Sequence, residues 1–478
     1  MATIEETKQT EFQNAKLTMD DFLANLSQED MKLEKTIENN FPNRFFAIQL
    51  GLSIKAQMLI EGITQPTALF LLGPPSALKS TTLEILSALP DCYRSDSFTP
   101  RAFVSHSANV SEKKLKSIDL LPKIKHKTLI TPELSILFTG NQEEVIYNFG
   151  MLTRILDGRG YVSDTGVHGQ RGYQGDYYFT WLGAVIEIPH RVWKLLGHLG
   201  PKIYFYRLPE ENITAEQKLA QIKKTLKENS YVNRLNSSKD AIRNFWDVLI
   251  QRPDMVDGKI VWDSARDDEE TVNKIIKLAM VLASLRATIP TWQTGDSDSS
   301  GSNYHFEMPI KEEPSRASSV LYNIARGHAV LYGRNHVTKD DLSVVVPIVR
   351  SSAPRERVDL FRLLIENDGL LNTEQLMNIA TMSRATALKE MQKLAIMGLV
   401  DKAEQATTTK PIVAIRLKNE FRWFLSPDFK QYWDEFHSSH TPKICELSPN
   451  EGENSEKRGV CEPLGSNFTE EGEEHACN

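Results

Sequence analysis

Two hydrophobic patterns alternate between residues 46 and 210 of this chain. Short continuous apolar runs are typical of strands that are buried on both faces. Between these runs, apolar residues recur every three or four positions, as in amphipathic helices. Strands that alternate with helices predict an α/β fold with a mainly parallel sheet. We expect its strands near residues 68–72, 102–105, 126–133, 178–185 and 203–208.

Residues 211–350 are predicted to be mainly helical, with helices near 215–228, 240–250 and 268–288 and another from residue 314. A stretch rich in Gly, Ser and Asp, residues 293–303, predicts a flexible loop insertion. Farther along, Thr338 is placed to cap a helix, because Asp341 follows three residues later in an acidic variant of the capping box.

The segment 351–425 has a different order of predicted elements: helix, short helix, turn, helix and hairpin. This order predicts a winged helix-turn-helix. Its third helix carries Arg384, Lys389 and Lys393 on the expected outer face against a single Glu, which gives a modest basic charge. Winged helices bind either DNA or protein, and the sequence leaves both partners open.

The two ends of the chain are polar. Residues 1–45 show weak helical periodicity, which predicts an N-terminal helical extension that packs on the next domain. Residues 438–478 are acidic and without periodicity, which predicts a disordered tail. The net charge is −7, and residues 443–478 alone hold nine Glu against two Lys and one Arg. The acidic total therefore does not argue against a local basic surface that binds nucleic acid.

The composition is that of an ordinary soluble globular protein, with 40% hydrophobic and 25% charged residues. No apolar run approaches the roughly 18 residues of a membrane span, and the polar N-terminus is unlike a signal peptide. The four cysteines have neither zinc-site spacing nor a disulfide framework. We therefore expect a cytoplasmic protein that has no membrane partner.

An apolar strand is joined to a predicted helix by the run Gly73-Pro74-Pro75-Ser76-Ala77-Leu78-Lys79-Ser80-Thr81. The order strand, turn, Lys-Ser and helix is that of a phosphate-binding loop. Amides of the loop and of the helix N-terminus would face the anion. Lys79 would reach the β- and γ-phosphates of ATP, and the Ser80 hydroxyl would bind Mg²⁺. The alternative is an ordinary strand–helix junction with a Lys at its cap.

Leu78 stands where this motif has its second Gly. Because a Leu avoids positive φ, we expect the loop backbone to take a slightly different path there.

Glu133 ends the predicted strand at 126–133. In phosphate-loop ATPases this strand end supplies an Asp for Mg²⁺ and an acid that polarises the attacking water. Glu133 fits the second role, whereas Thr131 or Pro132 occupies the Asp position, so metal binding would depend on Ser80 and water. The alternative is a turn at the edge of the sheet.

Residues 157–175 are rich in Gly, Tyr and Arg. Such a composition is typical of hairpins that project from a sheet. Arg159 and Arg171 would suit contacts with DNA phosphates, and the neighbouring Tyr residues would suit base stacking. A decorated surface loop is the alternative.

These motifs and their order over residues 46–420 resemble the AAA+ ATPases, and within them the minichromosome maintenance (MCM) helicases and MCM-like ATPases of mobile elements. Ala77-Leu78-Lys79-Ser80 is similar to the Ala-Lys-Ser loop of these proteins. The segments from Asp157 to Gly166 and from Thr180 to Val185 are similar to their hairpin before the sensor 1 strand and to that strand. The resemblance implies a P-loop AAA+ core over 46–210, a helical lid over 211–350 and a ring-shaped homo-oligomer, a hexamer.

The same resemblance implies further site residues. Lys202 falls at the position of the family's arginine finger, with Arg207 farther on, and either would reach the phosphate of a neighbouring subunit. Arg316 precedes His328 by twelve residues, which is the spacing of the lid arginine that contacts the γ-phosphate. The Asn with which the family senses the phosphate is not evident, and Glu187 is the nearest polar candidate.

We therefore expect an ATP hydrolase that acts on DNA, as a helicase or replication-type motor. Two alternatives stay open. One is a MoxR- or chelatase-like ATPase that remodels protein and uses the winged helix as an adaptor. The other is a nucleotide-binding, DNA-bound switch with weak hydrolysis.

Overall fold

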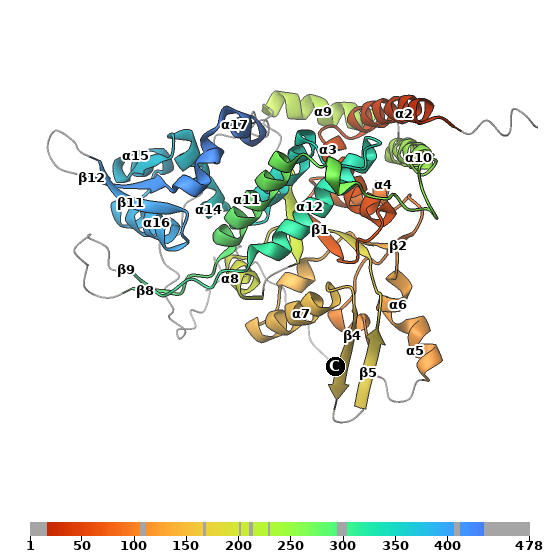
Figure 1. Cartoon of the computed structure of the whole chain (residues 1–478), viewed down its shortest axis with the longest axis horizontal. Coiled ribbons are helices and arrows are strands. Elements are labelled where there is room, and N and C mark those ends of the chain that lie inside the picture. The colour runs from red at the N-terminus through yellow and green to blue at the C-terminus, as the bar shows by residue number, and fades with distance from the viewer. Residues whose placement is uncertain are drawn as a thin grey trace, which may run out of the picture.

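A computed structural model gives the structure of the chain. It describes residues 17–105, 111–165, 169–199, 202–209, 214–227, 230–293, 304–405 and 412–434. The predicted acidic tail and nearly all of the predicted loop at 293–303 lie outside the described residues. Figure 1 shows a central body of sheet and helices, a hairpin that projects from it and a C-terminal unit beside it.

The central body is built on a five-stranded sheet with the strand order β2-β3-β6-β1-β7, and all of its pairings are parallel. The predicted parallel α/β sheet is therefore confirmed. Its strands are β1 (Thr67–Leu72), β2 (Cys92–Arg94), β3 (Thr128–Thr131), β6 (Thr180–Val185) and β7 (Ile203–Arg207).

One predicted strand was wrong. Residues 102–105 form no strand, and Ala102 is the last residue of a 3-10 turn at Pro100–Ala102. Phe103 and Val104 are apolar because they are buried in the core, not because the chain is extended there. The edge strand is formed instead by Cys92–Arg94, which is too short to show a strand pattern in the sequence.

Helices cover both faces of the sheet. In β1, Leu69 and Leu71 face one hydrophobic core, whereas Phe70 and Leu72 face the other. The first core is formed with α2 (Met19–Asn40), α3 (Phe45–Ala56), α4 (Lys79–Leu86), α10 (Tyr231–Leu249), α11 (Glu269–Arg286), α12 (Pro314–Leu331) and α13 (Leu342–Ser351). The second core is formed with α6 (Leu120–Ile124), α7 (Gln142–Ile155) and α8 (His190–Leu199).

The helix α12 packs directly on α3. A Cβ placed on Gly327 would lie 1.9 Å from the carbonyl oxygen of Ser53, so only Gly permits this approach. Before α13, Thr338 and Asp341 form the predicted capping box, which confirms that prediction. A short antiparallel ribbon of β8 (Thr291–Gln293) and β9 (Tyr304–Phe306) lies between α11 and α12 in the chain.

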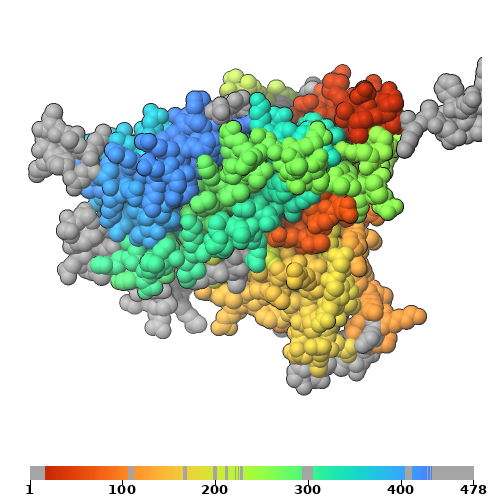
Figure 2. Space-filling model, in the orientation of Figure 1, coloured from red at the N-terminus to blue at the C-terminus, as the bar shows by residue number. Residues whose placement is uncertain are grey.

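The predicted hairpin is confirmed as an antiparallel pair of β4 (Gly160–Thr165) and β5 (Gly169–Gln174). It projects away from the central body, near α5 (Glu112–Ile118), as Figures 1 and 2 show. Its base, at Gly158, adjoins the chain that leads into β1: a Cβ there would lie 2.5 Å from the Thr64 carbonyl oxygen.

The C-terminal unit has its own three-stranded antiparallel sheet in the order β10-β12-β11. Its elements are α14 (Arg355–Glu366), β10 (Leu370–Asn372), α15 (Thr373–Ala380), α16 (Arg384–Ile396), β11 (Val400–Gln405), β12 (Ile412–Leu417) and α17 (Pro427–Asp434). The remaining helix, α9 (Ala215–Lys227), precedes α10. Within the described ranges, no helix has both the length and the apolar character needed to cross a bilayer.

Candidate nucleotide-binding site

The loop between β1 and α4 has an unusual backbone. Two of its residues hold a positive φ, 65° at Ser76 and 60° at Leu78. Leu78 therefore adopts the left-handed conformation that a Gly would take, and the expectation that a Leu avoids it was wrong. This conformation costs a residue other than Gly about 1–2 kcal/mol. The Leu78 side chain packs against the first hydrophobic core, the one that contains α3 and α12, and this burial offsets part of the cost.

The helix α4 begins at Lys79 without a side-chain cap, because Leu78 has no oxygen to offer. The uncapped first turn of a helix attracts anions through its amides and its dipole. Ser80 in this turn is exposed, as binding to a metal would require. The hydroxyl of Thr81 lies 3.0 Å from that of Tyr231, the first residue of α10.

The Lys79 ammonium is held inside the loop. Its side chain is almost buried, and Nζ donates to the carbonyl oxygens of Gly73 and Pro74, each at 2.7 Å. Burial lowers the pKa of Lys79, and the charge of Glu133 opposes this effect. Phosphate oxygens of a nucleoside triphosphate could replace these two carbonyls as acceptors of the Lys79 ammonium.

Glu133 follows β3 and is exposed, with its Oε1 accepting the Ser135 amide at 2.7 Å. Thr131 and Pro132, the two candidates for the position of the metal-binding Asp, are both buried, and Thr131 accepts a hydrogen bond from Trp181 Nε1 at 3.1 Å. Among the described residues, no group of three His, Cys, Asp or Glu side chains could hold a metal ion. A Mg²⁺ ion would therefore depend on Ser80, water and the phosphates themselves.

Arg207 and Glu187 form an ion pair at the same edge of the sheet. Both guanidinium Nη atoms donate to the carboxylate, at 2.6 and 2.9 Å. Burial would raise the pKa of Glu187, but the hydrogen bonds and charge of Arg207 outweigh it and lower the pKa. Lys79, Glu133, Glu187 and Arg207 thus all follow or end strands at the carboxyl edge, where open parallel sheets bind their ligands.

Lys202 lies at the opposite, amino edge, just before β7. Its side chain is buried and forms an ion pair with Asp157, and Nζ also donates to the Thr153 carbonyl at 2.7 Å. Burial lowers the pKa of Lys202, and the hydrogen bond and charge of Asp157 oppose this. The ammonium is therefore satisfied within the chain.

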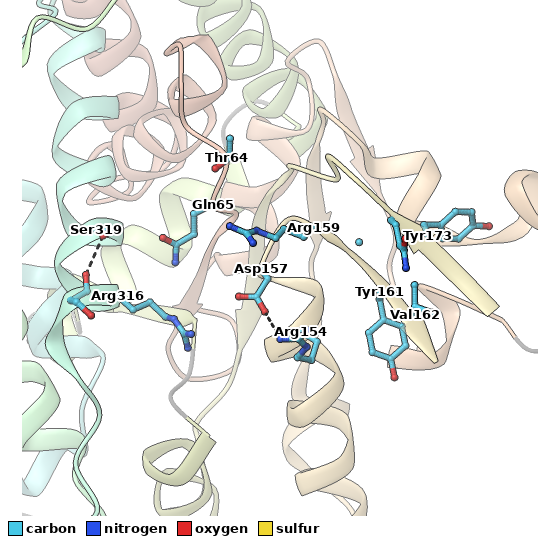
Figure 3. A pocket seen from close by; sticks show the side chains of 13 residues that line it. Thr64, Gln65, Arg154, Asp157, Arg159, Tyr161, Val162, Tyr173, Arg316 and Ser319 are labelled. Carbon is cyan, nitrogen blue, oxygen red and sulfur yellow. Dashed lines mark hydrogen bonds and ion pairs between the residues drawn. The ribbon is translucent and has the colours of Figure 1, made fainter. Parts of the chain in front are cut away.

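A cavity of about 820 Å³ opens at this amino edge. It is lined by residues before β1, by the last turn of α7, by the base of the hairpin and by the first two turns of α12. Figure 3 shows Arg154, Arg159 and Arg316 around the carboxylate of Asp157. Arg154 was not among the predicted site residues. Its only sequence signal is that it ends a helix just before the Gly turn of the hairpin.

Arg316 is separated from Lys79 by the length of β1. This strand has six residues, which corresponds to about 20 Å, and the cavity adjoins its start whereas the loop follows its end. Arg316 therefore does not reach a phosphate bound by the loop of its own chain. The predicted contact between Arg316 and a γ-phosphate therefore stays a prediction, and the nucleotide would have to be bound by another subunit.

The predicted DNA contacts fall in two places. Arg159 lies at the base of the hairpin, and Arg171 lies on β5 opposite Ser163. On α16, Arg384 is exposed and Lys389 is half-buried, whereas Lys393 forms an ion pair with Glu390 at 2.7 Å. In Figure 1 the hairpin and α16 lie at different ends of the molecule. Their roles stay predictions.

The comparisons with known proteins bear on the lid. The family model of the AAA lid domain matches residues 311–352, which contain α12, the capping box and α13. A comparison with curated proteins finds no match. A lid of this family indicates an AAA+ ATPase, a class of proteins that use ATP. The predicted resemblance is confirmed at this level, while its narrower MCM-like form stays a prediction.

Proposed function

We propose that this protein is an AAA+ motor that binds ATP with Mg²⁺, assembles into a ring of identical subunits and acts on DNA. One observation carries the proposal: the two edges of the central sheet are chemically complementary. The carboxyl edge has the phosphate loop, and the amino edge has a cavity lined by three arginines. AAA+ proteins commonly form rings, in which one edge of a subunit can face the opposite edge of the next.

The carboxyl edge would bind and activate the nucleotide. Lys79 would exchange its two carbonyl acceptors for phosphate oxygens, and the exposed Ser80 hydroxyl would hold Mg²⁺. Glu133, which is close enough to act on the pKa of Lys79, would orient the attacking water. Phosphoryl transfer depends mainly on positioning and charge neutralisation, so each of these groups should affect turnover.

The amino edge would complete the site of the neighbouring subunit. Lys202 is tied to Asp157, and Arg207 faces the loop of its own chain. Arg154, Arg159 and Arg316 line the cavity instead, and a guanidinium suits phosphate better than an ammonium because its planar fork binds two oxygens. We therefore assign to these arginines the role that the resemblance gave to Lys202 or Arg207.

Action on DNA would involve the hairpin and the C-terminal unit. The order of α14, β10, α15, α16, β11 and β12 and the sheet order β10-β12-β11 support a winged helix. Arg384 on α16 would contact DNA phosphates. Arg159 and Arg171 would do so on the hairpin, whose Tyr161 and Tyr173 face each other across β4 and β5.

A second candidate is the nucleotide-binding switch with weak hydrolysis. The buried Thr131 at the metal-binding position favours it, because a carboxylate ligand for Mg²⁺ is missing there. The remodelling of protein by a MoxR- or chelatase-like ATPase is a third possibility. In that case the pairing of Lys393 with Glu390 would reflect an α16 that contacts protein.

ATP hydrolysis measured without DNA, with single-stranded DNA and with double-stranded DNA separates these functions. The DNA motor predicts hydrolysis that DNA stimulates several-fold. Hydrolysis that DNA leaves unchanged would favour a protein substrate, and DNA binding without appreciable turnover would favour the switch. If the Lys79→Ala variant keeps both nucleotide binding and ATP hydrolysis, the proposal is wrong.

A mixing experiment tests the action between subunits. Lys79→Ala and Arg316→Ala subunits should each be inactive alone. A mixture should regain part of the activity, because some interfaces then combine an intact loop with an intact Arg316. A mixture that stays inactive would show that Arg316 does not act on the neighbouring nucleotide.

A further inference from the structure

The helix α9 is amphipathic, but its apolar side is not covered by any other described part of the chain. Leu219, Ile222 and Leu226 are 53%, 49% and 80% exposed. Residues spaced by three and four positions lie on one face of a helix. Every side chain of α9 that the structure describes is exposed, so this apolar stripe faces solvent.

The charges of α9 restrict what could cover the stripe. The helix carries four Lys against one Glu. Lys223 follows directly after Ile222, and Lys218 precedes Leu219, so cations flank the apolar residues. A single helix of this length is marginally stable in water without packing. The expected partner is therefore a segment that combines apolar side chains with a high density of carboxylates.

The chain itself contains a segment with this chemistry. The described residues end at Asp434 in α17, and nine Glu against three basic residues follow at 443–478. Between these carboxylates stand the apolar residues Ile444, Leu447, Val460, Leu464 and Phe468. In the view of Figure 1, α17 and α9 both lie along the upper rim of the molecule. Thirty extended residues span about 100 Å, so the segment is long enough to reach α9.

We propose that the acidic segment 443–478 docks on the basic, apolar face of α9, defined by Leu219, Ile222 and Leu226. The contact would stabilise α9 and fix the start of α10, which follows it. The Tyr231 hydroxyl at that start lies 3.0 Å from Thr81 in the helix of the phosphate loop. Docking therefore connects the C-terminal segment to the nucleotide site through one short helix junction.

Hydrogen–deuterium exchange of the full chain and of a chain that ends at residue 442 tests the proposal directly. Removal of 443–478 should speed amide exchange in 215–227 at least several-fold and leave β1, β3 and β6 unchanged. A synthetic 443–478 peptide added to the shortened chain should restore protection, with an affinity that falls as salt rises. Leu219→Ser with Ile222→Ser in the full chain should give the same fast exchange, and the peptide should not reverse it.

Other outcomes identify other occupants. Exchange in 215–227 that is unaffected by the deletion would overturn the proposal. If protection rises with protein concentration in both chains, the occupant is a second copy of α9, and if only DNA protects the helix, the lysines bind phosphates. A peptide of the same composition in scrambled order that protects equally would show that charge alone acts, which contradicts docking of the apolar stripe. None of these readouts depends on ATP hydrolysis, so they stand apart from the test of the proposed function.

Discussion

Arg207 hydrogen-bonds both carboxylate oxygens of Glu187 across the end of β1. The strands that carry or precede these two residues, β7 and β6, lie on either side of β1. They are therefore two strand spacings apart, about 9–10 Å, and only long side chains can meet over the strand between them. The ion pair fixes a guanidinium beside the loop that follows β1.

Glu187→Gln should release Arg207 from this position. Exposed ion pairs contribute only about 0–1 kcal/mol to stability, so we expect little change in thermal unfolding. We expect kcat for ATP to fall about tenfold, which corresponds to about 1.4 kcal/mol of activation free energy. Glu61→Gln, at an exposed site before β1, is the matched control. An unchanged kcat would exclude a role for Arg207 in the chain's own site.

Glu133→Gln should separate nucleotide binding from turnover. The amide keeps the size of the side chain and can still accept the Ser135 amide, but it cannot polarise water as a carboxylate does. General-base catalysis contributes about 10²–10⁴-fold to rates, so hydrolysis should fall at least a hundredfold while the Kd for ATP changes little. Binding of a fluorescent ATP analogue and release of phosphate measure the two effects. If the Glu133→Gln variant still hydrolyses ATP, another group must orient the attacking water.

The Leu78→Gly variant should be more stable to unfolding than the Leu78→Ala variant. In an ordinary helix position Gly is less stable than Ala by roughly 0.5–1 kcal/mol. At the positive φ of residue 78 the order should reverse, with Gly the more stable by about 1 kcal/mol. Urea denaturation of both variants measures this difference. Because both variants lack the Leu side chain, the free energy lost with that side chain largely cancels in the comparison. Equal or greater stability of the Ala variant would mean that the loop relaxes out of the left-handed region.

The buried Asp341 should make the lid sensitive to acid. It accepts two hydrogen bonds from Arg334, at 2.7 and 2.8 Å, and lies 2.7 Å from His328 Nδ1. Burial would raise the pKa of Asp341, but the hydrogen bonds of His328 and Arg334 outweigh it, so the pKa falls below its ordinary 3.8. A pKa that is lower in the folded state stabilises that state above the unfolded pKa, and this contribution disappears as the pH falls through the folded value.

We therefore expect the free energy of unfolding to drop below about pH 4 in the wild-type chain. Asp341→Asn should lower it at pH 7 by about 3 kcal/mol, because Arg334 loses its buried partner, and should show a shallower drop in acid. Urea titrations between pH 3 and pH 7 measure both effects. Parallel pH curves for the two proteins would contradict the assignment to Asp341.

Among the predicted DNA contacts of α16, Arg384 should contribute most. Its side chain is exposed, whereas the Lys393 ammonium is already bonded to Glu390. Arg384→Ala should weaken DNA binding and reduce the slope of log K against log salt by about one, the value for one phosphate contact. Lys393→Ala should have a smaller effect on both quantities. Binding isotherms at several salt concentrations provide the measurement, and equal effects of the two variants would show that the Lys393 pair opens on DNA.

The sequence predicted the elements whose local pattern matches their tertiary role. The continuous apolar runs of β1, β6 and β7 are buried on both faces, and Thr338 and Asp341 act locally as a cap. The strand β2 was missed because a run of only three residues carries no clear pattern, and its conformation depends on pairing with β3. The conformation of Leu78 was mispredicted because only the general preference of Leu for negative φ was considered. The packing of the Leu78 side chain, which offsets part of the cost of a positive φ, is not visible in the sequence.

For the candidate site, the sequence predicted residues but not how the fold groups them. The phosphate loop and Glu133 lie at one edge because each directly follows a strand of a parallel sheet. Arg316, Arg154 and Arg159 come from three separate segments, and the contact of α12 with α3 brings Arg316 to the amino edge. The partner of Lys202, Asp157, is 45 residues away in the chain. No spacing in the sequence indicates such long-range contacts.

Gly327 also limits how this molecule can move. At Gly327 the backbone of α12 lies directly against that of α3 at Ser53, so no side chain separates the two helices at this point. The segment from α3 to β1 includes a 3-10 helix at Gln57–Leu59, and β1 leads into the predicted phosphate loop. We therefore expect a movement of β1 to be passed on to α12 through α3.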